Sequence, residues 1–344
     1  VPDDLVGTYF RSGPAMFSAG SILPPKKSLI QPKTPPVADG VDMDRMVSHP
    51  YEGDGAVLGI TFTNDGEVTA RYRFVRSVPF TYERKKGLRV YRGMDSSRQQ
   101  GSMVGSGLGN DLPLPLYRHN FLPGLNKLRK NCANLKAIYF GKRLFSLWEG
   151  GQPHKLDALA LSTDGRSMLG GAIKKETDPF GGAMVVDPTN GHGLFYSLAH
   201  EGRDTDLVLF EFGEDFKLID NGRVETRLPG LALVTDFAAT QDYGVFVQPA
   251  CKTSMAFVVD KAPKNIEIIE SSPATLHLVP RPGSKMTKAS YQIPVDEISD
   301  ANVQFVNAYQ EGNKVVVDLI RSDSSQKSDM PLKWPWGSTL NEYQ

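Results

Sequence analysis

The chain has 344 residues, and its 39 basic side chains balance its 39 acidic ones, so the formal net charge is zero at neutral pH. A chain of this length can bury a sizeable core in one large domain or two. Nucleic-acid binding requires a basic face that displaces counterions from phosphates. The balanced charge gives that function no support, so we expect no nucleic-acid partner.

The cysteine content and the hydropathy exclude two further classes. Cys132 and Cys251 are the two cysteines of the chain and cannot form a disulfide framework. We expect two reduced, packed thiols, with a single bridge as the alternative. No run approaches the roughly 18 apolar residues that span a bilayer. The chain starts at Val1 without an initiator methionine, which indicates a processed or incompletely defined N-terminus.

Short β-branched strands alternate with turn signals along the chain. Residues 56–63 and 67–75 flank an Asn-Asp-Gly turn, whose Asp-Gly pair supplies the positive φ values of a tight hairpin. The pattern recurs at 137–140 with 144–147, at 158–161 before a Thr-Asp-Gly turn, at 183–186 with 194–198, at 207–212 with 217–219, within 231–248, and at 303–309 with 314–320. About six or seven hairpins and no long amphipathic helix predict an all-β fold. They favour a propeller of four-stranded blades over two β-sandwiches in tandem.

Residues 87–130 interrupt this rhythm. Their first part is rich in glycine and serine, which is typical of a flexible loop. Apolar side chains then mix with cations, and this mixture suits an anionic membrane surface or a partner protein. The predicted contact residues are Leu114, Leu116, Phe121, Leu122, Leu125, Lys127, Arg129 and Lys130. The alternative is a long loop packed on its own protein.

Separate motifs over nearly the whole chain resemble those of the carotenoid cleavage oxygenase family, in the family's order. They are 2–14 (PDDLVGTYFRSGP), 51–57 (YEGDGAV), 133–157 (ending LWEGGQPHKLD), 187–195 (DPTNGHGLF), 231–248 (LALVTDFAATQDYGVFVQ), 303–318 (VQFVNAYQEGNKVVVD) and 332–334 (LKW). The resemblance implies a seven-bladed β-propeller of the carotenoid oxygenase type. It would form a single domain over 1–344, with 87–130 as an inter-blade insertion. Because the family domain extends beyond Gln344, we expect it to be incomplete at the C-terminus.

The family resemblance also implies an iron ion held by four histidines from four blades, beside an apolar tunnel. Imidazole is a suitable ligand for ferrous iron. At the ligand positions this chain has Ala183, or Asp178 if an insertion is allowed, followed by Thr235 and Gln304. The fourth position lies beyond the end of the chain. Glu149 retains the carboxylate of the family's Trp-Glu pair, which orients a ligating histidine.

The histidines of the chain match none of these ligand positions. They are His49, His119, His154, His192, His200 and His277. Alanine has no donor atom, while threonine and glutamine offer weak neutral oxygens. We therefore expect no catalytic residues, no metal and no iron cofactor, with Ala183, Thr235 and Gln304 as degenerate ligand positions.

The resemblance then implies a non-catalytic relative. Such a protein would bind a carotenoid or another apolar isoprenoid, or serve as a peripheral structural subunit of a pigment-containing photosynthetic membrane complex. The alternative is a carotenoid cleavage dioxygenase that cleaves a carotenoid double bond oxidatively at a non-standard metal site. Family members that handle carotenoids are common in plastids and cyanobacteria, so we expect a thylakoid-associated plastid protein, either soluble or peripheral. The expected partners are subunits of a membrane complex or the membrane surface.

Overall fold

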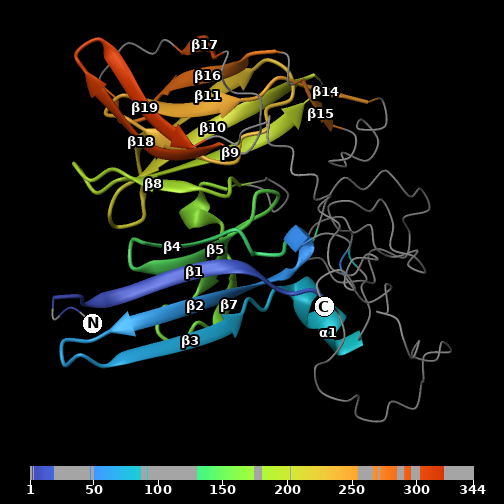
Figure 1. The fold of residues 1–344 in the computed structure, drawn as a ribbon, viewed down its shortest axis with the longest axis vertical. Helices are drawn as coiled ribbons and strands as arrows, with labels where there is room; N and C mark the ends of the chain where they lie inside the picture. The colour runs from blue at the N-terminus through green and yellow to red at the C-terminus, as the bar shows by residue number, and fades with distance from the viewer. Residues whose placement is uncertain are drawn as a thin grey trace, which may run out of the picture.

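The structure, a computed structural model, describes residues 2, 4–18, 47, 50–86, 91, 130–173, 180–201, 203–254, 266–269, 272–284, 290–295 and 303–320. These residues form a series of antiparallel sheets. In Figure 1 the N-terminal sheet, in blue, lies toward the lower end of the molecule, and the sheets drawn in yellow to red lie together toward the upper end. The described residues also include one α-helix, α1 (Val78–Lys86), and two short 3-10 helices, η1 (Pro50–Glu52) and η3 (Leu169–Gly171). Within the described residues, no helix has the length and apolar character needed to cross a bilayer.

The first sheet contains β1 (Gly7–Met16), β2 (Asp54–Phe62) and β3 (Val68–Phe74), in that order. The predicted hairpin is confirmed here, since Phe62 pairs with Val68 and Gly66 takes a φ of 79° in the turn. The side chains of β3 are mostly exposed, so this strand forms an open edge of the sheet.

The second sheet contains β4 (Lys136–Phe140), β5 (Arg143–Leu147), β6 (His154–Leu156) and β7 (Thr163–Arg166). The strand predicted at 158–161 is wrong, because these residues turn the chain between β6 and β7. The Asp157 carboxylate accepts the backbone N–H groups of Leu159 (2.9 Å) and Ala160 (2.5 Å). These N–H groups are thus bonded to a side chain and not to the backbone of a neighbouring strand.

The third sheet contains β8 (Met184–Val186), β9 (Gly193–Glu201), β10 (Asp204–Phe212) and β11 (Leu218–Leu228). The fourth contains β12 (Phe237–Ala239), β13 (Tyr243–Gln248), β16 (Ala274–Pro280) and β17 (Tyr291–Val295). A hairpin of β14 (Cys251–Thr253) and β15 (Ile266–Ile268) lies between β13 and β16, and the last sheet pairs β18 (Gln304–Glu311) with β19 (Lys314–Ile320). Each sheet is a local antiparallel meander, as expected for propeller blades.

The strand expected at the start of 231–248 begins later than predicted. Residues 231–236 form no strand, and β12 starts at Phe237. Side chains bind the backbone in this stretch. The Ala232 N–H donates to Thr205 Oγ1 (2.9 Å), and the Leu231 carbonyl accepts from Gln248 Nε2 (3.4 Å).

Each pair of successive sheets encloses its own apolar core. Val57 and Leu144 meet between the first and second sheets, and Phe145 and Phe212 meet between the second and third. Between the third and fourth sheets, the Tyr196 ring lies 5.1 Å from the Phe237 ring and 5.6 Å from the Phe246 ring, centroid to centroid. Ala238, Val245, Leu278 and Ala308 continue this packing to the last sheet. Burial of each large side chain is worth about 1.5–3 kcal/mol, so face-to-face packing of sheets stabilises the arrangement.

Both cysteines are free thiols, as predicted, and Cys132 is buried. Burial raises the pKa of Cys132, and its Sγ donates to the carbonyl of Glu52 (3.4 Å). The thiol therefore packs as a neutral group near the first sheet.

Candidate functional site

The three predicted ligand positions lie at the starts of the first strands of three successive sheets. We call β4, β8, β12 and β18 the leading strands. β12 lies against both β8 and β18. Ala183 immediately precedes β8, Thr235 precedes β12 by two residues, and Gln304 begins β18. The three positions therefore occur at the same end of neighbouring strands.

The contacts at this end join the positions across sheets. Thr235 Oγ1 donates to the carbonyl of Val303, the residue before Gln304, over 3.5 Å. Ala183 is fully buried in the apolar core that also contains Val234. Thr235 is half-buried and Gln304 is exposed. These side chains offer one hydroxyl and one amide, and Ala183 offers no donor at all.

An ion pair between distant parts of the chain crosses the same end of the leading strands. Lys136, the first residue of β4, places its Nζ 3.0 Å from Asp236 Oδ1, and these residues are 100 positions apart in sequence. Asp236 Oδ2 accepts the backbone N–H of Phe305 on β18 (3.1 Å). The Asp236 side chain is 17% exposed and that of Lys136 is 45% exposed. One carboxylate thus connects β4, the start of β12 and β18.

Glu149 belongs to the same group of charges. Water can reach its side chain, but protein atoms crowd the carboxylate, so burial raises its pKa to about 7 although Lys136 acts to lower it. The Glu149 charge and the Asp236 charge, after burial, also raise the pKa of Tyr196, whose hydroxyl donates to the Val234 carbonyl (3.1 Å). We call Lys136, Glu149, Tyr196 and Asp236 the leading-end cluster.

Gly182 provides the space in which this cluster packs. A Cβ atom at Gly182 would lie 2.9 Å from Cγ of Glu149 and would also collide with the side chain of Leu135. Leu135 stands where the family motif has threonine, and it remains partly exposed. An apolar side chain therefore lies next to a carboxylate that changes its protonation near neutral pH.

Comparison with known proteins now decides the family. The family model described as retinal pigment epithelial membrane protein matches residues 1–338. The chain belongs to this family of carotenoid oxygenases. It is 30% identical to the apocarotenoid-15,15'-oxygenase of a Synechocystis strain over 338 residues, which are 96% of this chain and 59% of that protein. It is 29% identical to the chloroplastic carotenoid cleavage dioxygenase 7 of Oryza sativa over 48% of this chain and 21% of the relative.

Solved structures agree with the sequence comparison. A variant of the Synechocystis apocarotenoid oxygenase superposes with a TM-score of 0.70 and 29% identity, over 94% of this chain and 59% of that chain. The predicted fold class, an all-β propeller of the carotenoid oxygenase type, is thereby confirmed. The chain spans about three-fifths of the length of these relatives.

The expectation of no iron cofactor is wrong for a member of this family. The family is one of iron-dependent oxygenases, and its curated and solved relatives point to iron. One solved relative is a cobalt-substituted Synechocystis enzyme, 28% identical with a TM-score of 0.70 over 94% of this chain and 60% of that one.

The donors at the leading ends do not fit a site of four imidazoles. Ala183, Thr235 and Gln304 provide none, and the Lys136 ammonium already neutralises Asp236. Across the described ranges, no group of three or more His, Cys, Asp or Glu side chains is arranged to hold a metal ion. Iron bound by this protein would require a different ligand set or donors from other parts of the chain.

The described histidines are placed in structural roles. His154, expected in a turn, is instead buried in β6, where burial and then Arg166 lower its pKa to about 4. His277 Nε2 lies 2.7 Å from Gln248 Oε1, and burial lowers its pKa to about 4. His192 Nδ1 lies 2.8 Å from Glu211 Oε1. His49, His119 and the His200 side chain lie outside the described part, as does Asp178.

Lys130 corrects the prediction of a surface contact for that residue. Its side chain is 7% exposed, and its Nζ lies 2.7 Å from Asp54 Oδ2 and 2.6 Å from Glu83 Oε2. Burial opposes the charge, but the two carboxylates raise the pKa of Lys130 overall. This ammonium is therefore bound by two carboxylates inside the protein and does not form a surface contact. The other predicted contact residues, from Leu114 to Arg129, lie outside the described residues.

The sequence carries only part of the signal for this site. Glu149 and Thr235 could be predicted from the sequence because they lie in family motifs. Lys136 and Asp236 also lie in matched motifs, directly after Leu135 and Thr235. The motifs do not show that these two side chains form an ion pair. Only the fold brings two charges 100 residues apart into contact.

Proposed function

We propose that this chain is part of an oxygenase that cleaves a double bond of a carotenoid-type substrate. Its metal site would have a ligand set other than four imidazoles. The observation that carries the proposal is the match over 96% of the chain to a relative named as an apocarotenoid oxygenase. The convergence of the leading strands, with Glu149 retained there, supports the same location for the chemistry.

The chain's own residues can contribute binding and proton transfer at this location. Glu149, with a pKa of about 7, can hold or release a proton near neutral pH. The half-exposed Lys136 ammonium can orient an oxygen-bearing end of a substrate, while Asp236 fixes the position of that ammonium. Leu135 supplies partly exposed apolar surface beside these groups.

A second function is favoured by one specific observation. Ala183, Thr235 and Gln304 occupy three ligand positions without an imidazole, which suits a protein that binds a carotenoid or another apolar isoprenoid without cleaving it. Such a protein would serve as a peripheral subunit of a pigment-containing membrane complex in a plastid. The scaffold and the apolar contacts would remain useful, although the bond-breaking chemistry would be lost.

One experiment separates the two functions. The full-length protein is loaded with ferrous iron without oxygen, its metal content is measured, and an apocarotenal is added with oxygen. Aldehyde products detected by chromatography, together with oxygen uptake, support the oxygenase. A shifted absorption spectrum with fully recovered substrate, at measured iron occupancy, overturns the oxygenase and supports binding alone.

A matched pair of variants connects the result to the leading-end cluster. Glu149→Gln removes the titrating carboxylate, whereas Glu214→Gln changes an exposed carboxylate in the turn between β10 and β11. If the cluster takes part, Glu149→Gln lowers turnover and changes the pH profile near pH 7, while Glu214→Gln changes neither. Equal pH profiles for both variants would exclude Glu149 from the reaction.

A further inference from the structure

A cavity of about 590 Å³ lies beside the open edge of the first sheet, away from the leading-end cluster. It is lined by residues of β3 and α1, by Arg76 between them, and by residues 161–163 at the start of β7. Its apolar wall includes Phe74, Phe80 and Leu161. Phe80 and Leu161 are buried, and the Phe74 and Phe80 rings stack with centroids 5.7 Å apart. The stacked rings of Phe74 and Phe80 therefore form a fixed hydrocarbon surface in the cavity, and Leu161 adds another apolar side chain to its lining.

The charged lining of this cavity has one sign. Arg73, Arg76 and Arg84 contribute three guanidinium groups, and the lining residues within the described part of the chain include no aspartate or glutamate. Hydroxyl groups of Tyr72, Thr81, Ser162 and Thr163 complete the polar part of the lining. Guanidinium groups bind carboxylates and phosphates through paired N–H donors, so the cavity is suited to an anion.

A second cavity shows that such an imbalance is not general in this protein. It has a volume of about 400 Å³ and also contains two arginines, but Asp206 and Glu225 line it as well. Arg227 Nε lies 3.1 Å from Asp206 Oδ1, and Arg223 pairs with Glu225. The cations of the second cavity are therefore neutralised by the protein itself.

Among the described residues, no carboxylate forms an ion pair with Arg84. Its guanidinium carbon lies 5.4 Å from the centroid of Phe80 and 6.0 Å from that of Phe74. One of its terminal nitrogens donates to Met16 Sδ over 3.2 Å, which is a weak acceptor. Aromatic faces attract the guanidinium but leave its charge in place. Arg84 is thus held next to the hydrocarbon wall with its charge not neutralised.

We propose that this cavity binds a free single-chain amphiphile with a carboxylate or phosphate head. Arg73, Arg76 and Arg84 hold the head, and the chain lies on Phe74, Phe80 and Leu161. A purely polar anion would leave the apolar wall wet, while a neutral hydrocarbon would leave three guanidinium charges without a counter-ion. The proposal is independent of the oxygenase reaction, because none of these residues belongs to the leading-end cluster.

The test measures binding of decyl phosphate, below its micelle concentration, to the full-length protein by calorimetry. We expect saturable binding by the original protein. Each single variant, Arg73→Gln or Arg76→Gln, should bind with an affinity about tenfold lower than that of the original protein. Both side chains are exposed, so thermal unfolding of each variant is expected to match that of the original protein. Arg227→Gln in the second cavity is the matched control and retains full affinity.

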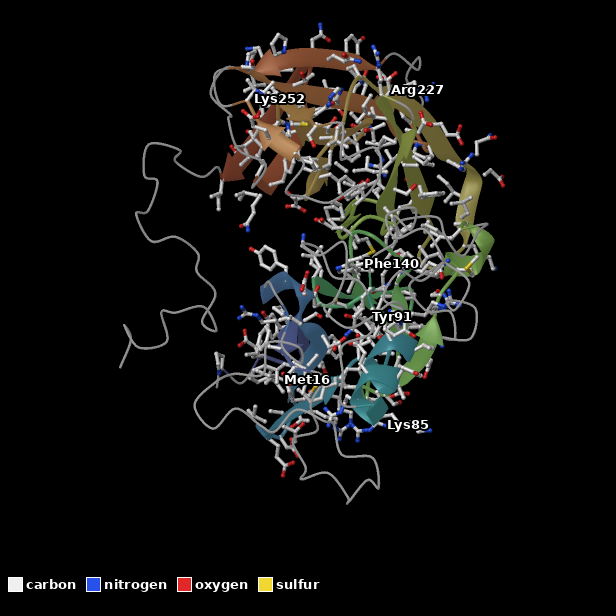
Figure 2. All side chains as sticks on the ribbon, turned by 90° about the vertical axis from the view of Figure 1, so that its right-hand side faces the viewer. Met16, Lys85, Tyr91, Phe140, Arg227 and Lys252 are labelled. Atoms are coloured by element: carbon white, nitrogen blue, oxygen red, sulfur yellow. The ribbon has the colours of Figure 1, made fainter. Side chains whose placement is uncertain are left out.

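The two cavities are well separated for this purpose. Figure 2 labels Lys85 of α1 at one end of the molecule and Arg227 of β11 toward the other. Absence of binding, or equal loss in Arg76→Gln and Arg227→Gln, would overturn the proposal. Arginine-dependent binding to vesicles with anionic lipid, without binding of soluble decyl phosphate, would also overturn it and indicate a bilayer headgroup instead.

Discussion

Two kinds of charged group occur between the sheets, and they differ in what surrounds them. Arg281 is 3% exposed, with its guanidinium nitrogens 2.6 Å from Asp187 Oδ2 and 2.7 Å from Glu211 Oε1. Lys136, at the leading ends, is 45% exposed and has one close carboxylate. The buried group joins the third and fourth sheets, whereas the exposed one joins β4 to the residue before β12. The Arg281 contacts between the third and fourth sheets are therefore buried, while the Lys136 side chain at the leading ends is accessible to solvent.

The largest expected effect comes from removing the buried cation. Arg281→Met leaves Asp187 and Glu211 without their counter-charge and frees the Thr240 carbonyl, which now accepts from Arg281 over 2.9 Å. We expect a loss of about 4 kcal/mol in the free energy of unfolding, measured by chemical denaturation. The control Arg227→Met removes an exposed ion pair and costs less than about 1 kcal/mol. Similar losses in both variants would contradict the comparison.

The same cluster predicts a pH dependence of stability. Burial acts to raise the pKa of Asp187 and Glu211, but hydrogen bonds outweigh it and lower both below their ordinary values of 3.8 and 4.5. A lowered carboxyl pKa contributes stability above the unfolded value, and that stability is lost as the pH falls through the folded value. The deficit of Arg281→Met against the original protein should thus shrink in acid. A constant deficit from pH 7 to pH 3 would contradict this.

Lys130 should behave like Arg281 with a somewhat smaller effect. Lys130→Met leaves the carboxylates of Asp54 and Glu83 buried without the ammonium that lies within 2.7 Å of both. We expect a loss of about 3 kcal/mol in unfolding free energy. Lys217→Met removes an exposed ammonium 2.9 Å from Asp215 and should change stability by less than about 1 kcal/mol. An equally small change for Lys130→Met would show that the ion pairs of Lys130 with Asp54 and Glu83 do not stabilise the fold.

The next effect concerns the packing of the leading-end cluster. Gly182→Ala places a methyl group against Leu135 and Glu149, and such overpacking costs about 1–3 kcal/mol. Leu135→Ala in the same chain should restore most of the loss, because it removes the nearer side chain. Thermal unfolding of the single and double variants measures this coupling. Additive losses would show that Gly182 and Leu135 do not share the space.

The smallest expected effect is a shift in the titration of Glu149. Its raised pKa of about 7 means that its carboxylate form is disfavoured in the folded state, so its contribution to stability falls as the pH rises from about 4.5 through 7. Because water reaches the side chain, this change is below about 1 kcal/mol. Lys136→Met removes the nearby positive charge and should raise the Glu149 pKa further. Infrared titration of the carboxyl group, with Glu149→Gln to assign it, would show no shift if the two groups do not interact.

The sequence predicts local elements well and distant contacts poorly. The hairpin of β2 and β3 follows from an Asn-Asp-Gly turn between alternating strands, since both signals act within a few residues. Residues 158–161 and 231–236 also look like strands. However, Asp157 in the first case and side chains of neighbouring strands in the second bind their backbone groups. Hydrogen bonds to side chains therefore outweighed the local preference of these residues for strand structure.

The candidate site shows the same division more sharply. Family motifs predict Ala183, Thr235, Gln304 and Glu149 by position, but the meaning of Lys130 and Lys136 depends on the fold. Lys130 lies next to a segment that reads as membrane-facing, yet two distant carboxylates bury it. Lys136 lies in a family motif, but that motif does not show that its ammonium meets Asp236, which precedes β12 of the fourth sheet. Charge pairing over long separations is set by topology, which a single sequence does not display.

The most direct test is oxygen-dependent product formation by the full-length protein after loading with ferrous iron and addition of an apocarotenal. We expect two aldehyde fragments, in amounts that follow oxygen uptake and fall in Glu149→Gln. Intact substrate recovered from protein with measured, bound iron would contradict the account and leave a carotenoid-binding scaffold in its place.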